Sequence, residues 1–312
     1  MKLHEKSEDF LQAIQATAQK MGIPDVFVEK DYWVTWVLRN LSKIDAANQF
    51  VFKGGTSLSK AHKILERFSE DIDLAVVAQG QNGNQIKNLI SATSKKITGL
   101  PLQEIETKDT SKGSQFRKTV HQYPRLKSLS GDFGQASPNL LLEINSFTNP
   151  TPFSRMNIQC LVAEQLPESV TEYDLEPVVV NVIGLERTFV EKIMALVRAS
   201  YEGENALREK VRHFYDLINI FPRVSGLCLT DPNKLKKLLS EVQETDQKII
   251  KDEWIKQPIL EAPLFKDLDG TIEKARPAYE GTEFKALVWG KMPLLNVSRV
   301  VLEQVSTALQ KS

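Results

Sequence analysis

Two aspartates spaced two residues apart, Asp71 and Asp73, are the side chains of this sequence best placed for metal chemistry. Ile72, Leu74 and Val76 alternate with them, a pattern that predicts a β-strand. Residues two apart on a strand point to the same face, so the two carboxylates repel each other unless a cation lies between them. Carboxylate oxygens suit Mg²⁺ or Mn²⁺, and such ions can bind a triphosphate and activate an attacking hydroxyl. Taken alone, such a pair is more often two solvated acids on an edge strand.

A pair of glycines lies upstream of these aspartates, directly after a short apolar segment. Residues 50–52 are aromatic or β-branched, which predicts a strand that the glycines end. Glycine lets backbone N–H groups approach a phosphate closely, and Thr56 is expected to cap a helix that runs to about Glu66. The string lacks the Walker A pattern, and alone it fits an ordinary strand-to-helix turn. The candidate phosphate-binding residues are Gly54, Gly55, Thr56, Ser57 and Lys60.

The order of these features resembles the signature of the polymerase-β-like nucleotidyltransferases: strand, Gly-Gly-Thr-Ser, helix, then Ser-Glu-Asp-Ile-Asp-Leu on the next strand. The string FKGGTSLSKAHKILERFSEDIDL resembles the AbiEii/AbiGii toxin family more closely still. This resemblance implies that Asp71 and Asp73 hold the metal, and that residues 54–57, Lys60 and Ser69 bind a nucleoside triphosphate. The superfamily usually adds a carboxylate on a later strand, for which Glu143 is the best candidate. Because Glu143 is out of phase with the apolar residues around it, an exposed or hydrogen-bonded structural glutamate fits that position as well.

Two segments of the second half also resemble AbiEii elements. Residues 185–192 match an element in which a lysine on a helix, here Lys192, serves the reaction, and Asp216 matches an aspartate on the following helix. Without the resemblance, Lys192 is interpreted as a lysine at a helix edge and Asp216 as a solvated acid. The segment Glu-Lys-Asp-Tyr-Trp at 29–33 is similar to one that precedes the glycine motif in many members, but no catalytic role is assigned to it.

The overall composition is that of a globular protein rather than a disordered or membrane-spanning one. The chain has 312 residues, of which 41% are hydrophobic and 26% charged, and a formal net charge of +0. No apolar run reaches the roughly 18 residues that a membrane helix requires, and no signal peptide is expected. Two cysteines are too few for a disulfide framework or a thiolate metal site. These features predict a cytoplasmic protein.

The charge is less even locally, with an excess of basic residues between residues 95 and 127. Lysine and arginine neutralise nucleic-acid phosphates, so this stretch is a candidate RNA surface. A solvated basic loop is the alternative. The RNA-binding candidates are Lys112, Arg117 and Lys118.

The hydrophobic pattern predicts a mixed α/β first half and a mostly helical second half. Strands are expected at 50–52, 72–76 and 140–144, extended segments at 156–164 and 177–183, and helices near 10–21, 25–41, 85–97, 189–197, 211–221, 231–250 and 295–310. We therefore expect an α/β (α+β) polymerase-β-like sheet with flanking helices in residues 1–175, followed by a helical domain in residues 176–312.

Together these features predict a metal-dependent nucleotidyltransferase that is the toxin of a type IV-like toxin–antitoxin (abortive infection) system. The resemblance implies transfer of a nucleotidyl group to RNA, at the 3′ end of tRNA, and a cognate AbiEi-type antitoxin as partner. Lys192 would neutralise charge on the phosphates, and Asp216 would orient Lys192 or activate the acceptor hydroxyl. Two alternatives remain: a module that senses nucleotide or RNA without turnover, and a phosphotransferase that uses the same metal site.

Overall fold

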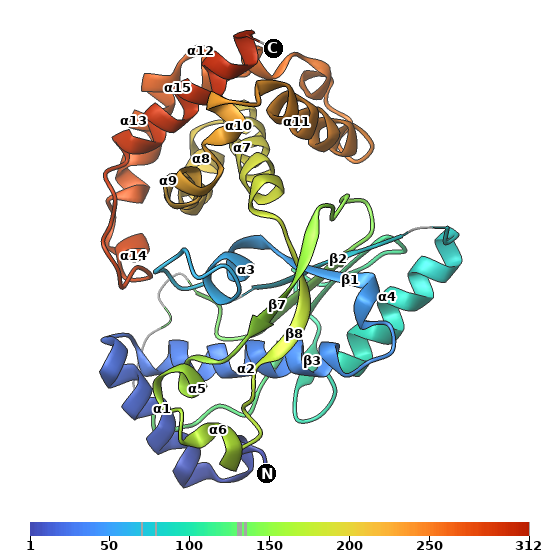
Figure 1. Ribbon diagram of the computed structural model, residues 1–312, viewed down its shortest axis with the longest axis vertical. Coiled ribbons are helices and arrows are strands. Elements are labelled where there is room, and N and C mark those ends of the chain that lie inside the picture. Colours follow the sequence, from blue (N-terminus) through green and yellow to red (C-terminus); the bar gives the residue numbers. More distant parts are fainter. Residues whose placement is uncertain (70, 79, 130–132, 134–135, 312) are drawn as a thin grey trace. The chain divides into compact units, whose positions relative to one another are not determined.

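The computed structural model describes the chain from residue 1 to residue 311, except for residues 70, 79, 130–132 and 134–135 (Figure 1). The chain divides into two compact units, of which the first comprises residues 1–63 and 67–183 and the second residues 64–66 and 184–312. The first unit holds the whole sheet and the second is helical. No helix among the described residues is both long and apolar enough to cross a membrane.

The first unit is built on a mixed sheet of order β3-β5-β6-β2-β1-β8-β7, with β4 paired to β5. Its strands are β1 (Phe50–Lys53), β2 (Asp71–Val76), β3 (Gln103–Ile105), β4 (Ser111–Lys112), β5 (Phe116–Gln122), β6 (Leu140–Asn145), β7 (Phe153–Ile158) and β8 (Val178–Ile183). Strand β8 pairs in parallel with β1 and antiparallel with β7. It therefore belongs to the sheet unit, although the predicted boundary after residue 175 placed it in the helical half.

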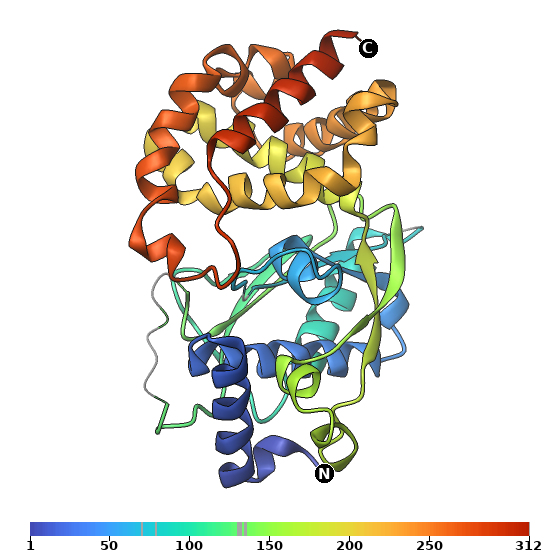
Figure 2. The same ribbon diagram turned by 60° about the vertical axis from the view of Figure 1, so that its left-hand side comes forward.

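Helices accompany the sheet as predicted. They are α1 (Ser7–Met21), α2 (Asp25–Ser42), α3 (Gly54–Lys60), α4 (Gly83–Ile97), α5 (Leu161–Gln165) and α6 (Ser169–Glu172). The long helices α2 and α4 lie on the same side of the sheet (Figures 1 and 2). Ile72, Leu74, Leu142 and Ile144 are buried and alternate with half-buried residues along β2 and β6. This alternation gives the sheet one apolar face for the helices and one face with charged side chains.

Two local predictions were wrong. Helix α3 begins at Gly54 and ends at Lys60, not at Glu66. The carbonyl of Glu66 instead accepts hydrogen bonds from the amides of Trp289 and Gly290, so long-range backbone pairing takes residues 64–66 away from the helix. Residues 161–165 form helix α5 rather than extended chain, and the Leu161 amide donates to the Asp31 carboxylate at 2.8 Å. A cap supplied from a distant helix leaves no mark in the local sequence pattern.

The second unit is a set of helices, which confirms the predicted helical half. They are α7 (Leu185–Glu202), α8 (Glu204–Glu209), α9 (Val211–Val224), α10 (Gly226–Leu229), α11 (Pro232–Gln247), α12 (Pro263–Lys266), α13 (Leu268–Tyr279), α14 (Thr282–Lys285) and α15 (Asn296–Lys311). Helix α7 contacts α8, α9, α11 and α12, and Phe189, Ile193 and Leu196 on it are fully buried. Helix α7 is therefore the central helix of this unit.

The three charged residues Glu29, Lys30 and Asp31 are buried in the N-terminal half of α2. Glu29 accepts a hydrogen bond from the Leu126 amide at 2.7 Å, and the Lys30 ammonium donates to the Ser137 carbonyl. Asp31 pairs with Lys60 at 2.5 Å and also accepts from the Leu161 amide. The triplet therefore ties α2 to the segment before β6, to α3 and to α5, which gives it a structural role.

We expect Glu29 to make stability depend on pH. Burial raises the pKa of Glu29 to about 7, against the opposing effects of the Leu126 amide and Arg125. The folded protein then keeps a proton that the unfolded chain loses at lower pH, so this group's contribution to the free energy of unfolding falls as pH rises from 4.5 to about 7. The free energy of unfolding is measured with urea at about pH 5 and about pH 7.5. Between these two pH values, wild type should lose more stability than Glu29→Gln. An equal loss in both proteins would contradict the raised pKa of Glu29.

Candidate active site

Asp71 and Asp73 lie on the charged face of the sheet, as their alternation with Ile72 and Leu74 predicted. Strand β2 pairs in parallel with β6 so that Asp73 lies directly beside Glu143. Laterally paired residues of a sheet point to the same side. Glu143 therefore shares the face of the two aspartates, because it alternates with the buried Leu142 and Ile144 in the same way.

Two lysines extend this arrangement on either side. In the antiparallel pairing of β1 with β2, Lys53 lies opposite Asp73, and in that of β5 with β6, Lys118 lies opposite Glu143. Lys53, Asp73, Glu143 and Lys118 thus form one line across four strands, here named the charged row. All four are partly exposed. The row places two neighbouring carboxylates between two ammonium groups.

The carboxylates suit a magnesium ion bound together with its substrate. Among the described residues, no group of three or more His, Cys, Asp or Glu side chains is arranged to hold a metal by itself. Mg²⁺ is commonly held by one or two carboxylates, with substrate phosphates and water completing its octahedron. Asp71 and Asp73 provide such a pair on one face of β2. The donor set therefore fits Mg²⁺ or Mn²⁺ delivered with a nucleotide.

Gly54 lies in contact with the Asp73 carboxylate. Its φ of +77° is in the left-handed region. A Cβ at this position would lie 2.0 Å from Asp73 Oδ2, so only glycine leaves room for the carboxylate. The turn needs glycine here for two reasons, the positive φ of the backbone and the close approach of the Asp73 carboxylate.

Gly55 is also close to other side chains, those of Arg67 and Ser69. A Cβ at Gly55 would lie 2.8 Å from both Arg67 Nη2 and Ser69 Oγ. The Thr56 hydroxyl donates to Ser69 Oγ at 3.0 Å, and the Ser57 hydroxyl donates to the Gly54 carbonyl at 2.8 Å. The structure thus brings the predicted residues 54–57, Ser69 and Asp73 together at one turn.

Replacing Gly54 by alanine is expected to reduce nucleotide transfer by about 100-fold, because displacing a reacting group by about 1 Å has that effect. The methyl group would overlap the Asp73 carboxylate and strain the backbone at the same time. Gly80→Ala is the matched control, since Gly80 also has a positive φ of +72° but open space around it. If the two variants lose transfer activity equally, the contact between Gly54 and Asp73 has no part in the reaction.

Lys60 and Arg67 hold the turn from two sides. Lys60, at the end of α3, is buried in an ion pair with Asp31 of α2. Arg67, only 2% exposed, donates to the Phe68 carbonyl and places its guanidinium against Gly55. Arg67 was not among the predicted site residues. In the sequence it lies between Glu66 and Phe68, just before the Ser-Glu-Asp-Ile-Asp string.

In the helical unit, Lys192 of α7 and Asp216 of α9 form a buried ion pair of 2.5 Å. Asp216 is 0% exposed and Lys192 is 6% exposed, so the interpretations as a solvated acid and a helix-edge lysine were wrong. Lys192 Nζ also lies 3.4 Å from His213 Nδ1. The ion pair forms because α7 and α9 pack against each other along their apolar sides.

Two of the three basic RNA candidates are engaged within the sheet unit. The Lys112 ammonium pairs with Glu104 at 2.8 Å and also with Glu106. Arg117 is 8% exposed, and its Nε donates to Ser94 Oγ of α4 at 3.1 Å. Arg117 therefore points to the helix-covered face, whereas Lys118, the next residue, belongs to the charged row.

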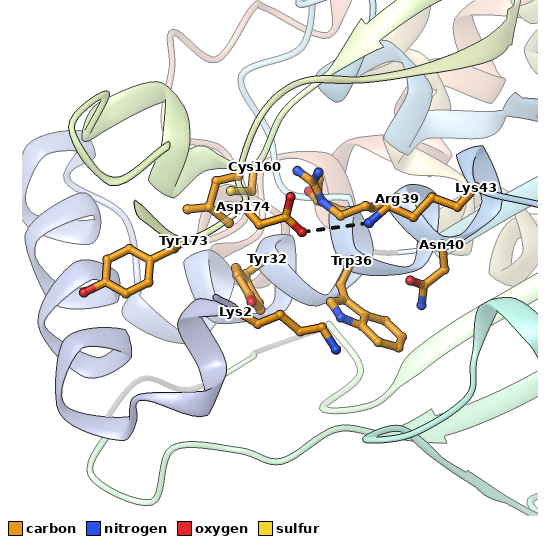
Figure 3. A pocket seen from close by; sticks show the side chains of 11 residues that line it. Lys2, Tyr32, Trp36, Arg39, Asn40, Lys43, Cys160, Tyr173 and Asp174 are labelled. Carbon is orange, nitrogen blue, oxygen red and sulfur yellow. Dashed lines mark ion pairs between the residues drawn. The ribbon is translucent and has the colours of Figure 1, made fainter. Parts of the chain in front are cut away.

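A separate pocket of the sheet unit lies along the C-terminal half of α2 (Figure 3). Its labelled side chains include Trp36 and Arg39 of α2, and Lys43 pairs with Asp174 across it at 3.8 Å. None of the predicted site residues lines this pocket. The glycine turn and the charged row are thus a distinct location.

The fold of this chain is similar to that of a solved nucleotidyltransferase toxin. Comparison with solved structures gives MenT4, a nucleotidyltransferase toxin from Mycobacterium tuberculosis H37Rv, at 15% identity and a TM-score of 0.52, covering 91% of this chain and 82% of that one. A protein from H. pylori provisionally assigned as a nucleotidyltransferase follows at 16% identity and a TM-score of 0.47, covering 91% and 94%. Comparison with curated proteins gives no match. At 15% identity, the likeness to MenT4 shows a shared fold.

The family follows from the sequence itself. Residues 36–285 match the profile of the nucleotidyl transferase AbiEii toxins of type IV toxin–antitoxin systems. The match begins within α2 and ends at α14, so it spans the glycine turn, both aspartates, Lys192 and Asp216. It covers most of the chain, and the chain therefore belongs to the AbiEii family of nucleotidyltransferase toxins.

Proposed function

We propose that this nucleotidyltransferase moves a nucleoside monophosphate from a nucleoside triphosphate to the 3′ end of an RNA, with tRNA as the acceptor. The observation that carries the proposal is the contact of the glycine turn with Asp73, beside Asp71 and Glu143 on one face of the sheet. A turn without side chains, next to carboxylates on one face, suits a polyphosphate that carries a divalent cation. We propose the cytoplasm as the location, because NTPs and tRNA are present there.

The residues of the sheet unit would divide the work as follows. Asp71 and Asp73 would hold Mg²⁺ or Mn²⁺, which when bound neutralises phosphate charge and favours ionisation of the acceptor hydroxyl. The turn at 54–57 and the Ser69 hydroxyl would bind the triphosphate. The acceptor oxygen forms a bond to the α-phosphorus, the bond to the β-phosphate oxygen breaks and pyrophosphate leaves. Glu143, beside Asp73, would take the hydroxyl proton.

Lys192 and Asp216 belong to the same proposal through the family motif. A buried lysine held at 2.5 Å by a carboxylate has a fixed position, which is what charge stabilisation in a transition state requires. Asp216 would orient Lys192 rather than contact substrate. A cognate antitoxin of the AbiEi type is the proposed protein partner, because the family is defined within type IV toxin–antitoxin systems.

Nucleotides labelled on different phosphates distinguish this reaction from its two alternatives. The protein is incubated with Mg²⁺, total tRNA and each of the four NTPs, labelled at the α- or the γ-phosphate. Transfer of the α label to RNA with release of pyrophosphate is expected. Transfer of the γ label would show a phosphotransferase instead. Nucleotide binding without transfer of either label would show a sensing module.

A further inference from the structure

Lys118 is the one member of the basic stretch from residue 95 to 127 that the strand pairing places in the charged row. Its neighbour Arg117 points to the opposite face and bonds to Ser94, and Lys112 is paired with two glutamates. The position of Lys118 follows from its register with Glu143 and from the register of Glu143 with Asp73. Its ammonium is thus carried on the same side of the sheet as the proposed metal ligands.

The two sides of Asp73 along the charged row present different chemical groups to a substrate. On the β1 flank, the glycine turn lies against Asp73 and offers backbone groups and hydroxyls. On the β6 and β5 flank, Asp73 is followed by Glu143 and then by Lys118. In phosphoryl transfer the attacking and leaving groups lie on opposite sides of the phosphorus. If the polyphosphate occupies the turn, the acceptor approaches from the flank of Glu143 and Lys118.

The spacing of the strands places Lys118 close enough to contact an acceptor bound beside Glu143. Neighbouring strands lie about 4.8 Å apart, so Lys118 is two strand spacings, about 10 Å, from Asp73 along the row. An extended lysine side chain measures about 6 Å from Cα to Nζ, because each of its single bonds is about 1.5 Å long. An extended Lys118 side chain is therefore long enough to bring its ammonium over Glu143, next to an acceptor end held above the carboxylates. An acceptor that carries phosphates would meet a cation there.

We infer that Lys118 binds a backbone phosphate of the nucleic-acid acceptor, close to the end that receives the nucleotide. This inference rests on the proposed function and deepens it. Of the three predicted RNA-binding residues Lys112, Arg117 and Lys118, it assigns the contact near the acceptor end to Lys118. It also separates the two substrates, with the nucleotide at the turn and the acceptor phosphate at Lys118.

The test compares Lys118→Ala and Lys118→Gln with Lys112→Ala, an exposed lysine of the same stretch that is paired with Glu104 and Glu106. Affinity for fluorescently labelled tRNA is measured by anisotropy over a salt series, without NTP. Affinity for a non-hydrolysable NTP with Mg²⁺ is measured by calorimetry. Both Lys118 variants should bind tRNA about three- to tenfold more weakly at low salt, with a salt dependence reduced by about one phosphate contact. Their NTP affinity should match wild type, and Lys118→Arg should restore tRNA binding.

Each other result overturns the inference in a recognisable way. Salt slopes equal to wild type in both Lys118 variants would remove Lys118 from the acceptor interface, and weakened NTP binding would place it at the nucleotide. Wild-type protein that fails to bind tRNA would also refute it. Because binding is measured without turnover, tRNA binding that depends on Lys118 but occurs without nucleotide transfer would refute only the proposed function.

Discussion

Replacing Asp73 by alanine is expected to abolish nucleotide transfer, with a loss of at least about 10³-fold, while the protein stays folded. The Asp73 carboxylate lies against the glycine turn and within the charged row, so its loss removes the proposed metal ligand nearest the turn. Removing a preorganised electrostatic group from an active site commonly has an effect of this size. Asp71→Ala should behave in the same way, because its side chain shares the face of β2. Labelled transfer to tRNA measures both losses.

Stability provides the control for this prediction. Asp71 and Asp73 are like charges two residues apart, so removing one relieves repulsion and should not lower the free energy of unfolding by more than about 1 kcal/mol. Asp109→Ala, which removes an exposed acid of the same unit, should leave both transfer and stability unchanged. Near-normal transfer by purified Asp71→Ala or Asp73→Ala protein would remove these residues from the reaction.

Replacing Lys192 by alanine is expected to lower both turnover and stability. The variant leaves Asp216 at 0% exposure without its ion-pair partner at 2.5 Å, and breaking a buried pair in this way costs about 3–5 kcal/mol. A lysine at a helix edge would have cost under about 0.5 kcal/mol. Turnover should fall by about 100-fold or more in addition, because a positioned cation contributes roughly 3 kcal/mol in the transition state.

A double variant separates the two effects. Lys192→Met combined with Asp216→Leu replaces the ion pair by apolar side chains of similar volume, which often restores or raises stability. We expect this protein to unfold at a urea concentration close to wild type but to transfer nucleotide no faster than Lys192→Ala. Arg198→Ala, which breaks a partly exposed pair with Asp246, should retain activity. Recovery of turnover together with stability would show that Lys192 is purely structural.

The sheet that carries the candidate site was predictable because its strands follow simple rules. The alternation around Asp71 and Asp73 fixed both the strand and the shared face of the two carboxylates, since a pleated strand repeats every two residues. The same rule set the phase of Glu143. It did not show that Glu143 lies next to Asp73, because the pairing of β2 with β6 joins segments about 70 residues apart.

Contacts between distant parts of the chain account for what the local sequence pattern did not show. Lys60 is a candidate phosphate ligand in the local string, and the structure adds a buried ion pair between Lys60 and Asp31 of α2. Asp216 falls outside the apolar stripe of α9 and still is buried, because Lys192 neutralises it. A sequence pattern records which residues are apolar, whereas the burial of a charge depends on a partner that local spacing does not reveal.

In the basic stretch of residues 95–127, too, the local sequence did not show which charges are paired. Its excess of positive charge suggested a broad RNA surface, yet Glu104 and Glu106 lie within it and bind Lys112. Net charge over a window ignores which acid faces which base. The strand register resolves this, because it turns Arg117 toward α4 and leaves Lys118 on the face of the carboxylates.

The most direct test of the central claim is to measure metal binding itself. Electron paramagnetic resonance detects free Mn²⁺ in solution. The amount of Mn²⁺ bound to the protein with a non-hydrolysable NTP is the difference between the total and the free ion. Wild-type protein should bind Mn²⁺ in the presence of the nucleotide, and Asp71→Ala and Asp73→Ala should bind it at least about tenfold more weakly. Equal Mn²⁺ binding by wild type and both variants would contradict a metal site at these two aspartates.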